Sequence, residues 1–278
     1  MGFEDVLWLG GGCGAGKSTV ARRLAYRFDL RLYRVDSFAY PHQGRIDAER
    51  HSTMDRLSRL SYAEMFVDTT VEEMVADFRD SAAEQFEMIV SDVEERRGGP
   101  LVIAEGPALF PELVAPWLAA PSHGLWLLPT PEFGALGRTR RVDIKPVAGS
   151  AAEVARRHLI ERDAWLTEVM RGQAEGLGLN TMVVDGSLDL GQTEAAVAKY
   201  FEGVLEGRRR ATGAERAAMR RAENAESHRA VTMFLDSLGD KAPDDPPPVD
   251  FACECETLGC GASVSLSPRR YRSPVLAH

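Results

Sequence analysis

Near the start of the chain stands the stretch Gly11-Gly12-Cys13-Gly14-Ala15-Gly16-Lys17-Ser18-Thr19. It fits the pattern G-x-x-x-x-G-K-[ST]. A short apolar run, residues 6–9, precedes it, and the segment behind it carries apolar residues at Val20, Leu24 and Phe28. The run predicts a buried strand, and the spacing behind it predicts one apolar face of a helix. Strand, glycine-rich turn and helix in this order predict a loop that binds phosphate groups.

The residue types of this loop explain the chemistry that we expect of it. Glycines let the backbone curl so that successive N–H groups point at phosphate oxygens, and the following helix adds its positive end. Lys17 would reach the β- and γ-phosphates, while the Ser18 hydroxyl would ligate Mg²⁺. The alternative is a glycine-rich turn that binds nothing. We predict that residues 11–19 bind a nucleoside triphosphate, with ATP and Mg²⁺ as the cofactors.

Composition and charge limit the classes of protein to which the chain can belong. Its 278 residues, 44% of them hydrophobic, are enough for a large core. The net charge of −9 argues against a general attraction to nucleic acid, so we expect no nucleic-acid partner. No apolar stretch reaches the roughly 18 residues that cross a bilayer, so we expect no membrane partner. The beginning of the chain lacks a basic secretion signal, and four cysteines make no disulfide framework, so we expect a cytoplasmic protein.

Four more apolar runs predict further strands. They are residues 30–35, 101–104, 125–128 and 181–184. Short apolar runs separated by helical stretches are typical of a parallel sheet covered on both faces, which is an α/β fold. Ligands of such sheets gather at the carboxyl ends of the strands. That rule places the phosphate loop, Asp36, Glu105 and the loop after residue 128 along one edge.

The chain divides into a main domain and an appendage. We predict a domain over residues 1–207, with a helical insertion at about 40–97, a connecting helix within 208–240, and a linker with a small cysteine-containing tail over 241–278. Thr70 and Glu73 form a capping box that begins the long helix of the insertion. The first half of the insertion is polar and basic. It either binds a second substrate or is a solvated excursion of the chain.

Two acids at predicted strand ends are candidate catalytic residues. Asp36 could accept a proton from a substrate hydroxyl, or it could only cap the following turn. Glu105 ends an apolar strand, where a carboxylate holds Mg²⁺ through water or polarises the attacking group. An unpaired buried carboxylate is costly, which favours a functional role for Glu105.

Six arginines follow the fourth predicted strand. They are Arg138, Arg140, Arg141, Arg156, Arg157 and Arg162. Transfer of a phosphoryl group needs cations around it, and guanidinium groups match phosphate well. Each arginine alone could equally be a surface charge. We expect at least one of them, with Arg162 as the candidate, to close over the phosphates.

The tail carries a candidate metal site. Cys253, Cys255, Cys260 and the terminal His278 give three thiolates and an imidazole, a ligand set that suits a structural Zn²⁺. The alternative is three reduced surface cysteines without a metal. Cys13 in the phosphate loop is either a reactive thiol, its pKa lowered by the surrounding amides, or merely a small side chain.

The chain resembles the P-loop small-molecule and nucleotide kinases, which include shikimate, gluconate and chloramphenicol kinases. The resemblance covers residues 5–206 and rests on the loop with Gly16-Lys17-Ser18, on Asp36, on Glu105 and on the later arginines. Val35-Asp36-Ser37 is similar to the segment that carries the proposed base of chloramphenicol phosphotransferases. The resemblance implies strand order 2-3-1-4-5, ATP·Mg²⁺ as donor and a hydroxylated small molecule as acceptor. The Cys-Glu-Cys tail resembles tails of uncharacterised bacterial proteins.

Two functions follow from these observations. The first is a kinase that transfers the γ-phosphate of ATP to a hydroxyl of a small molecule whose identity the residues do not specify. The second is an ATP-dependent switch in which the core binds nucleotide and the cysteine tail binds a partner protein.

Overall fold

The structure is a computed structural model that describes residues 2–140, 147–239 and 242–278. Its centre is a sheet of five parallel strands. They are β1 (Val6–Gly11), β2 (Arg31–Arg34), β3 (Val102–Glu105), β4 (Gly124–Pro129) and β5 (Thr181–Val184). Their order is β2-β3-β1-β4-β5. The predicted α/β class and the strand order 2-3-1-4-5 are confirmed.

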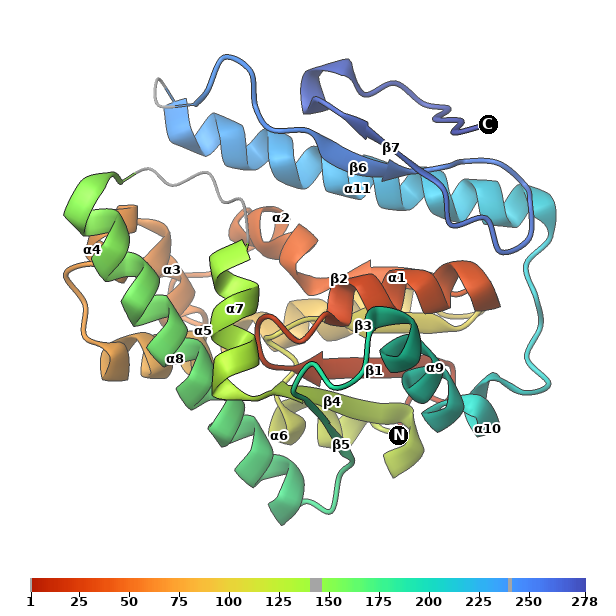
Figure 1. Ribbon diagram of the computed structural model, residues 1–278, viewed down its shortest axis with the longest axis horizontal. Coiled ribbons are helices and arrows are strands. Elements are labelled where there is room, and N and C mark those ends of the chain that lie inside the picture. The colour runs from red at the N-terminus through yellow and green to blue at the C-terminus, as the bar shows by residue number, and fades with distance from the viewer. Residues whose placement is uncertain (1, 141–146, 240–241) are drawn as a thin grey trace.

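Helices cover both faces of the sheet (Figure 1). One face carries α1 (Lys17–Phe28), α9 (Leu190–Tyr200) and α10 (Glu202–Leu205). The other face carries α5 (Val71–Glu95), α6 (Pro111–Val114) and α8 (Gly149–Gly176). Side chains of β1 alternate between the two cores, with Trp8 in one and Leu7 and Leu9 in the other. All three are fully buried, as the central strand of a doubly covered sheet requires.

Several helices lie between β2 and β3. After β2 the chain enters a 3₁₀ helix, Val35–Phe38, which leads into α2 (Ala39–Gln43), α3 (Ser52–Ser58) and α4 (Tyr62–Phe66). The capping box of Thr70 and Glu73 begins α5 as the sequence predicted. In Figure 1 the lobe of α3 and α4 lies at the left, beside α8.

Shorter elements complete the core. They are α7 (Pro131–Arg140) and the 3₁₀ helices Ala115–Trp117, Pro121–His123 and Pro268–Arg270. The helix α9 begins at Leu190, directly after a capping box that Asp189 and Gln192 form.

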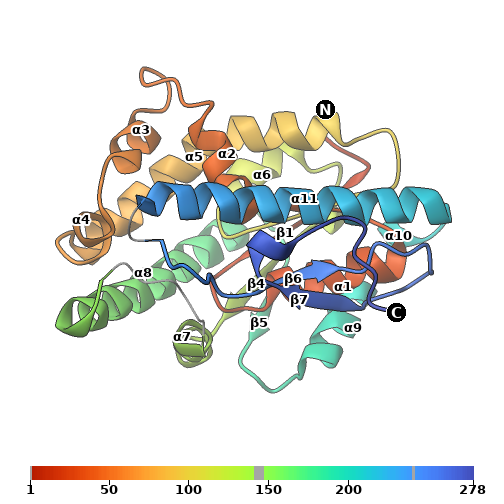
Figure 2. The same ribbon diagram turned by 90° about the horizontal axis from the view of Figure 1, so that it is seen from above.

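The helix α11 (Gly213–Leu238) packs between the core and the tail. The tail forms an antiparallel hairpin of β6 (Val249–Ala252) and β7 (Ser263–Leu266) that lies along α11. Figures 1 and 2 show the hairpin next to α11 from two directions. The helix α11 and the hairpin therefore form a packed layer beside the core.

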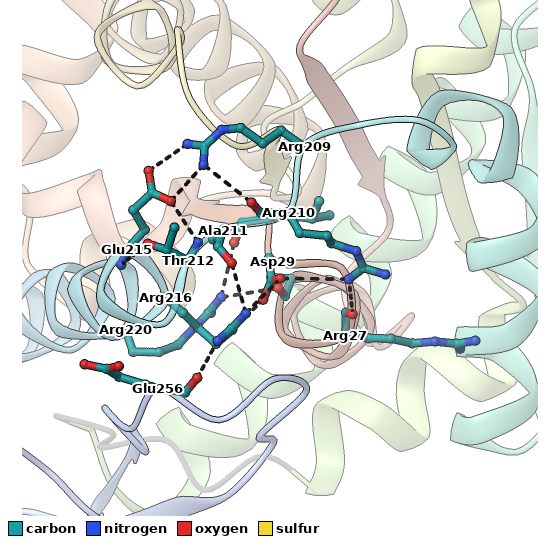
Figure 3. Close-up of polar contacts among 12 residues, drawn as sticks. Arg27, Asp29, Arg209, Arg210, Ala211, Thr212, Glu215, Arg216, Arg220 and Glu256 are labelled. Atoms are coloured by element: carbon teal, nitrogen blue, oxygen red, sulfur yellow. Dashed lines mark hydrogen bonds and ion pairs between the residues drawn. The ribbon is translucent and has the colours of Figure 1, made fainter.

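Buried charges attach α11 to the end of α1 (Figure 3). Asp29, which caps α1 with a left-handed φ of 58°, is buried and accepts a hydrogen bond from Arg216 Nε at 2.7 Å. Arg216 also donates to the backbone oxygen of Ala211 at 3.1 Å. Arg220 donates to the backbone oxygens of Ala25 and Leu30. These arginines thus bond buried polar groups at and beyond the end of α1, where α11 covers them.

Among the helices that the structure describes, none combines the length and the apolar character needed to span a membrane.

Candidate functional site

The phosphate loop has the backbone shape that its glycines predict. Gly11, Gly14 and Gly16 have φ values of 124°, 83° and 79°, a region that residues with a side chain rarely adopt. Gly16 is the N-cap of α1, so the first N–H groups of that helix face the loop. Lys17 is buried, and its ammonium donates to the backbone oxygen of Gly12 at 2.7 Å. The loop therefore holds its cation inside the curve where phosphate oxygens would lie.

The two predicted magnesium ligands lie together. Ser18 Oγ donates to Glu105 Oε2 at 3.0 Å. This contact follows from the sheet, because Ser18 lies in the first turn of α1, the helix after β1, and Glu105 pairs with Leu9 of β1. A hydroxyl and a carboxylate oxygen are the ligand types that Mg²⁺ uses at the phosphates of a nucleotide. Their positions fit that ion.

Burial governs the charge of Glu105. The side chain is 2% exposed, and burial raises its pKa to about 7, with the negative charge of Asp36 adding to the effect. Lys17 and Arg34 oppose this rise. A cation beside the ionised carboxylate would supply the counter-charge that burial makes necessary.

Asp36 lies at the same edge of the sheet. It is exposed in the first turn of the 3₁₀ helix that follows β2, and its charge acts on Glu105. The structure thus brings together Lys17, Ser18, Asp36 and Glu105, which the sequence placed at this edge by the rule for parallel sheets. The exposed carboxylate is free to approach a substrate hydroxyl.

Sequence reasoning missed Arg34 as a part of this edge. Arg34 pairs in register with Glu105 and lowers the pKa of that carboxyl group. Its guanidinium also donates to Ser227 Oγ on α11. No sequence signal marks this residue, because its contact depends on where α11 packs.

The helix α7 lies directly on the phosphate loop. A Cβ added to Gly137 would lie 2.9 Å from Gly14 Cα, and one added to Gly14 would lie 3.1 Å from the backbone oxygen of Gly134. Gly134 and Gly137 are spaced three residues apart and therefore share one face of α7. This glycine pair was a sequence signal for close helix packing that the sequence analysis did not use.

The arginine region is organised by an acid that sequence reasoning also missed. Asp163 accepts hydrogen bonds from Arg162 at 2.7 Å and from Arg138 Nε at 3.1 Å. Arg162 is buried on α8, and its guanidinium lies 5.2 Å above the ring of Phe78. The charges of all three polar groups act on Cys13, so they lie beside the loop. To contact a phosphate, Arg162 would have to give up at least one of its hydrogen bonds to Asp163.

The other candidate arginines differ in position. Arg140, Arg156 and Arg157 are exposed, and Arg141 lies outside the described residues.

Of the two alternatives for Cys13, the reactive thiol with a lowered pKa is contradicted. Burial raises the pKa of its thiol, and the nearby Asp163 raises it further. The charges of Lys17, Arg162 and Arg138 act in the opposite direction and are outweighed. The sequence analysis considered the loop amides, which would lower the pKa of the thiol. It did not consider that α7 covers the loop, and this burial raises the pKa.

The cysteines and histidine of the tail form one cluster. The ligand atoms of Cys253, Cys255, Cys260 and His278 all lie within 4.8 Å of one another. Ligands around a tetrahedral Zn²⁺ with sulfur at about 2.3 Å lie about 3.8 Å apart, so a small contraction suits this set to zinc. Burial alone would raise the pKa of Cys255, but hydrogen bonds from Thr257 and the neighbouring cysteines lower it to about 6. A thiol of this pKa is the thiolate that a metal requires.

The structure explains why cysteine and glutamate alternate in the tail segment Cys253-Glu254-Cys255. Alternate residues of an extended segment point to opposite sides. Cys253 and Cys255 therefore join the cluster, while the buried Glu254 accepts a hydrogen bond from Asn224 Nδ2 of α11 at 2.8 Å. Asn224 also exchanges two hydrogen bonds with the backbone of Ala252, at 2.9 and 2.8 Å. Residues 253–255 thus contribute both to the cysteine–histidine cluster and to the contact with α11.

Comparison with known proteins adds little to this geometry. No model of a protein family matches the chain, and no curated protein matches it. Among solved structures, an uncharacterized protein from Eubacterium ventriosum ATCC 27560 is 16% identical with a TM-score of 0.40, over 72% of this chain and 99% of that one. Shikimate kinase from Acinetobacter baumannii, in complex with shikimate, is 18% identical with a TM-score of 0.38, over 73% and 94%. Similarity this low carries no functional conclusion.

Proposed function

We propose that the protein is a kinase that transfers the γ-phosphoryl group of ATP to a hydroxyl of a small molecule. The observation that supports this most is the hydrogen bond of Ser18 to Glu105 beside a phosphate loop that encloses Lys17. A loop lysine, a hydroxyl and a carboxylate at adjacent strand ends are the parts that hold ATP·Mg²⁺ for phosphoryl transfer. The exposed Asp36 adds a group that can accept a proton.

Each residue of the proposed site has its own role in phosphoryl transfer. The loop amides and Lys17 bind the phosphate oxygens and stabilise charge that builds up on them. Ser18 and Glu105 would hold Mg²⁺, which neutralises the phosphates when it is bound. The hydroxyl oxygen of the acceptor attacks the γ-phosphorus, the bond to the β–γ bridging oxygen breaks, and ADP leaves. Asp36 accepts the proton that the hydroxyl loses.

The test of this function is the substitution Asp36→Asn, read by transfer of labelled phosphate. An acceptor is first found by a thermal-shift screen with a non-hydrolysable ATP analogue, because a bound acceptor stabilises the fold. Asp36→Asn should lower the rate of transfer by about 100-fold or more, as loss of a general base does, while the affinity for the analogue stays the same. Asp68→Asn, an exposed acid of the helical lobe, serves as the matched control. Equal rates for Asp36→Asn and wild type would exclude the assigned base.

We also propose that the tail binds a structural Zn²⁺. Cys253, Cys255, Cys260 and His278 would supply the four ligands, and the ion would fix a segment too small to fold by itself. Because ATP and reduced thiols are both required, we expect the protein to act in the cytoplasm.

The alternative function is an ATP-dependent switch whose tail binds a partner protein. The observation that favours it is the exposure of Leu258 and Leu276 in the tail, at 62% and 58%. Deleting residues 240–278 would expose the face of α11 that the hairpin covers, so substitution is the sharper test. If the protein is a switch, the double substitution Leu258→Ser and Leu276→Ser should abolish binding of a partner protein. If the protein is a kinase, the same double substitution should leave phosphate transfer unchanged.

A further inference from the structure

Arg34, at the end of β2, lies between two buried acids of different layers of the molecule. One is Glu105, its register partner on β3. Leu32 and Ile103, two residues earlier in the same strands, belong to the core beneath α1, so the side chains of Arg34 and Glu105 both point to that face. The other acid is Glu223 of α11; burial raises its pKa, and the charge of Arg34 is among those that oppose the rise.

A neutral hydroxyl of α11 holds the guanidinium of Arg34. Arg34 donates a hydrogen bond to Ser227 Oγ. Ser227 is buried, and its own hydrogen is used, because Oγ donates to the backbone oxygen of Glu223 at 2.7 Å. Its lone pairs are therefore left to accept from Arg34. Within the part of the chain that the structure describes, no ion pair joins Arg34 to Glu105 or to Glu223.

The position of this guanidinium matters for the proposed Mg²⁺ site. Arg34 and Glu105 lie on adjacent strands, which are about 4.8 Å apart, so the long arginine side chain can reach the carboxylate. A guanidinium paired with Glu105 would occupy its oxygens and repel a divalent cation. The carboxylate is open to Mg²⁺ as long as Arg34 stays on Ser227.

The tail determines where this part of α11 lies. Asn224, one turn before Ser227, exchanges two hydrogen bonds with the backbone of β6 and donates to Glu254 Oε1 at 2.8 Å. Glu254 is buried and stands between two residues of the candidate zinc site, Cys253 and Cys255. A metal bound by these cysteines would fix Glu254, and through it Asn224. Figures 1 and 2 show the hairpin lying along α11.

A second set of tail contacts meets the same turns of α11. His228, the neighbour of Ser227, donates from Nε2 to the backbone oxygen of Pro268 at 3.1 Å. The ring of Tyr271 lies 5.0 Å from that of His228, and its hydroxyl donates to Glu254 Oε1 at 3.4 Å. The contacts of the tail thus converge on the turns that carry Ser227.

We propose that Ser227 is a positioning residue, which holds Arg34 away from Glu105 so that this carboxylate is open to Mg²⁺, and that a metal in the tail site keeps Ser227 in place. The two states are two positions of the Arg34 side chain, on Ser227 or on Glu105. The tail metal then regulates how much Mg²⁺ nucleotide binding requires. This inference rests on the proposed kinase function, which assigns Mg²⁺ to Ser18 and Glu105.

Binding of a non-hydrolysable ATP analogue, titrated calorimetrically at a series of Mg²⁺ concentrations, tests Ser227 without phosphate transfer. Ser227→Ala should raise the Mg²⁺ concentration for half-maximal affinity by about tenfold, because Arg34 moves onto Glu105. Arg34→Gln removes the competing charge, so Ser227→Ala added to Arg34→Gln should cause no further change. Thr193→Val is the matched control and should behave as wild type does, since Thr193 Oγ1 of α9 likewise donates to the backbone oxygen four residues earlier.

The double variant separates positioning from a role in the fold alone. An equal rise in both backgrounds, or no rise in Ser227→Ala, would overturn the inference while leaving the proposed kinase intact. Failure of the wild-type protein to bind the analogue at any Mg²⁺ concentration would contradict the proposed kinase as well as this inference.

The same titration on zinc-free protein tests the tail. Protein stripped with a chelator and returned to Mg²⁺ should show the raised requirement of Ser227→Ala, whereas stripped Arg34→Gln should show no change. Glu254→Gln, with the metal in place, tests the same link in a protein that stays folded. Its neutral side chain accepts more weakly from Asn224, so the Mg²⁺ requirement should rise by about threefold. An unchanged requirement in Glu254→Gln, or in stripped protein that circular dichroism shows to be folded, would overturn the role of the tail.

Discussion

Glu105 shows how one buried side chain can combine stability with function. It is enclosed at the end of β3, where its pKa of about 7 lies well above the usual 4.5. Below about pH 7 the protonated form is favoured in the folded protein without a cation, because burial penalises the ionised form. A bound Mg²⁺ would reverse this preference. We therefore expect Glu105 to be tolerated in the core when it is neutral and to bind Mg²⁺ when it is ionised.

This pKa predicts how stability depends on pH. A carboxyl group with a raised pKa in the folded state stabilises the fold at low pH, and this contribution is lost as pH rises from about 4.5 to above 7. Relative to Glu105→Gln, which stays neutral, the wild-type free energy of unfolding should fall over this range by up to roughly 3 kcal/mol. Urea denaturation of both proteins without Mg²⁺, at about pH 5 and about pH 8, measures the difference. A difference that does not change with pH would show that Glu105 does not titrate there.

At the scale of elements, close packing of α7 shapes the phosphate loop. Gly137 contacts Gly14 so closely that a methyl group has no room, because Gly14 backbone atoms rather than a movable side chain lie opposite. The loop is thus held between α1 and α7. Its shape depends on both helices.

We predict that Gly137→Ala weakens binding of an ATP analogue. The methyl group must displace α7 or the loop, at a cost of about 1–3 kcal/mol, and the analogue should bind correspondingly less tightly. Gly172→Ala on α8 is the matched control, since a Cβ there meets nothing within 4 Å. It should raise stability by about 0.5–1 kcal/mol and leave nucleotide affinity unchanged. Calorimetric titration of both variants tests this, and equal affinities would refute the role given to α7.

At the scale of the whole molecule, the sequence predicts the parallel sheet and its functional edge better than it predicts side-chain contacts between elements that are distant in the sequence. Five apolar runs and one glycine loop were enough for the strands and for the edge where Lys17, Ser18, Asp36 and Glu105 meet, because parallel strands align their carboxyl ends. The pairing of Asp163 with two arginines and the contact of Arg34 with α11 could not be predicted. They depend on how helices distant in sequence pack, which local patterns do not encode.

The tail and α11 provide a prediction at this scale. Purified protein should contain about one zinc ion per chain, and Co²⁺ in its place should give thiolate charge-transfer absorption. Zinc at about a thousandfold above its dissociation constant should stabilise the fold by about 4 kcal/mol. Cys260→Ser should lose the metal, whereas Cys13→Ser should keep it. Metal-free wild-type protein, or metal retained in Cys260→Ser, would contradict the assigned ligands.

The central claim is that the loop at the end of β1 binds the triphosphate through Lys17. Calorimetric titration with a non-hydrolysable ATP analogue and Mg²⁺ measures this directly. Because Lys17 supplies a buried, charged donor, Lys17→Ala should weaken binding by about ten- to a hundredfold. Lys199→Ala, at an exposed lysine of α9, should bind as wild type does. Equal affinities of folded Lys17→Ala and wild-type protein would contradict the account.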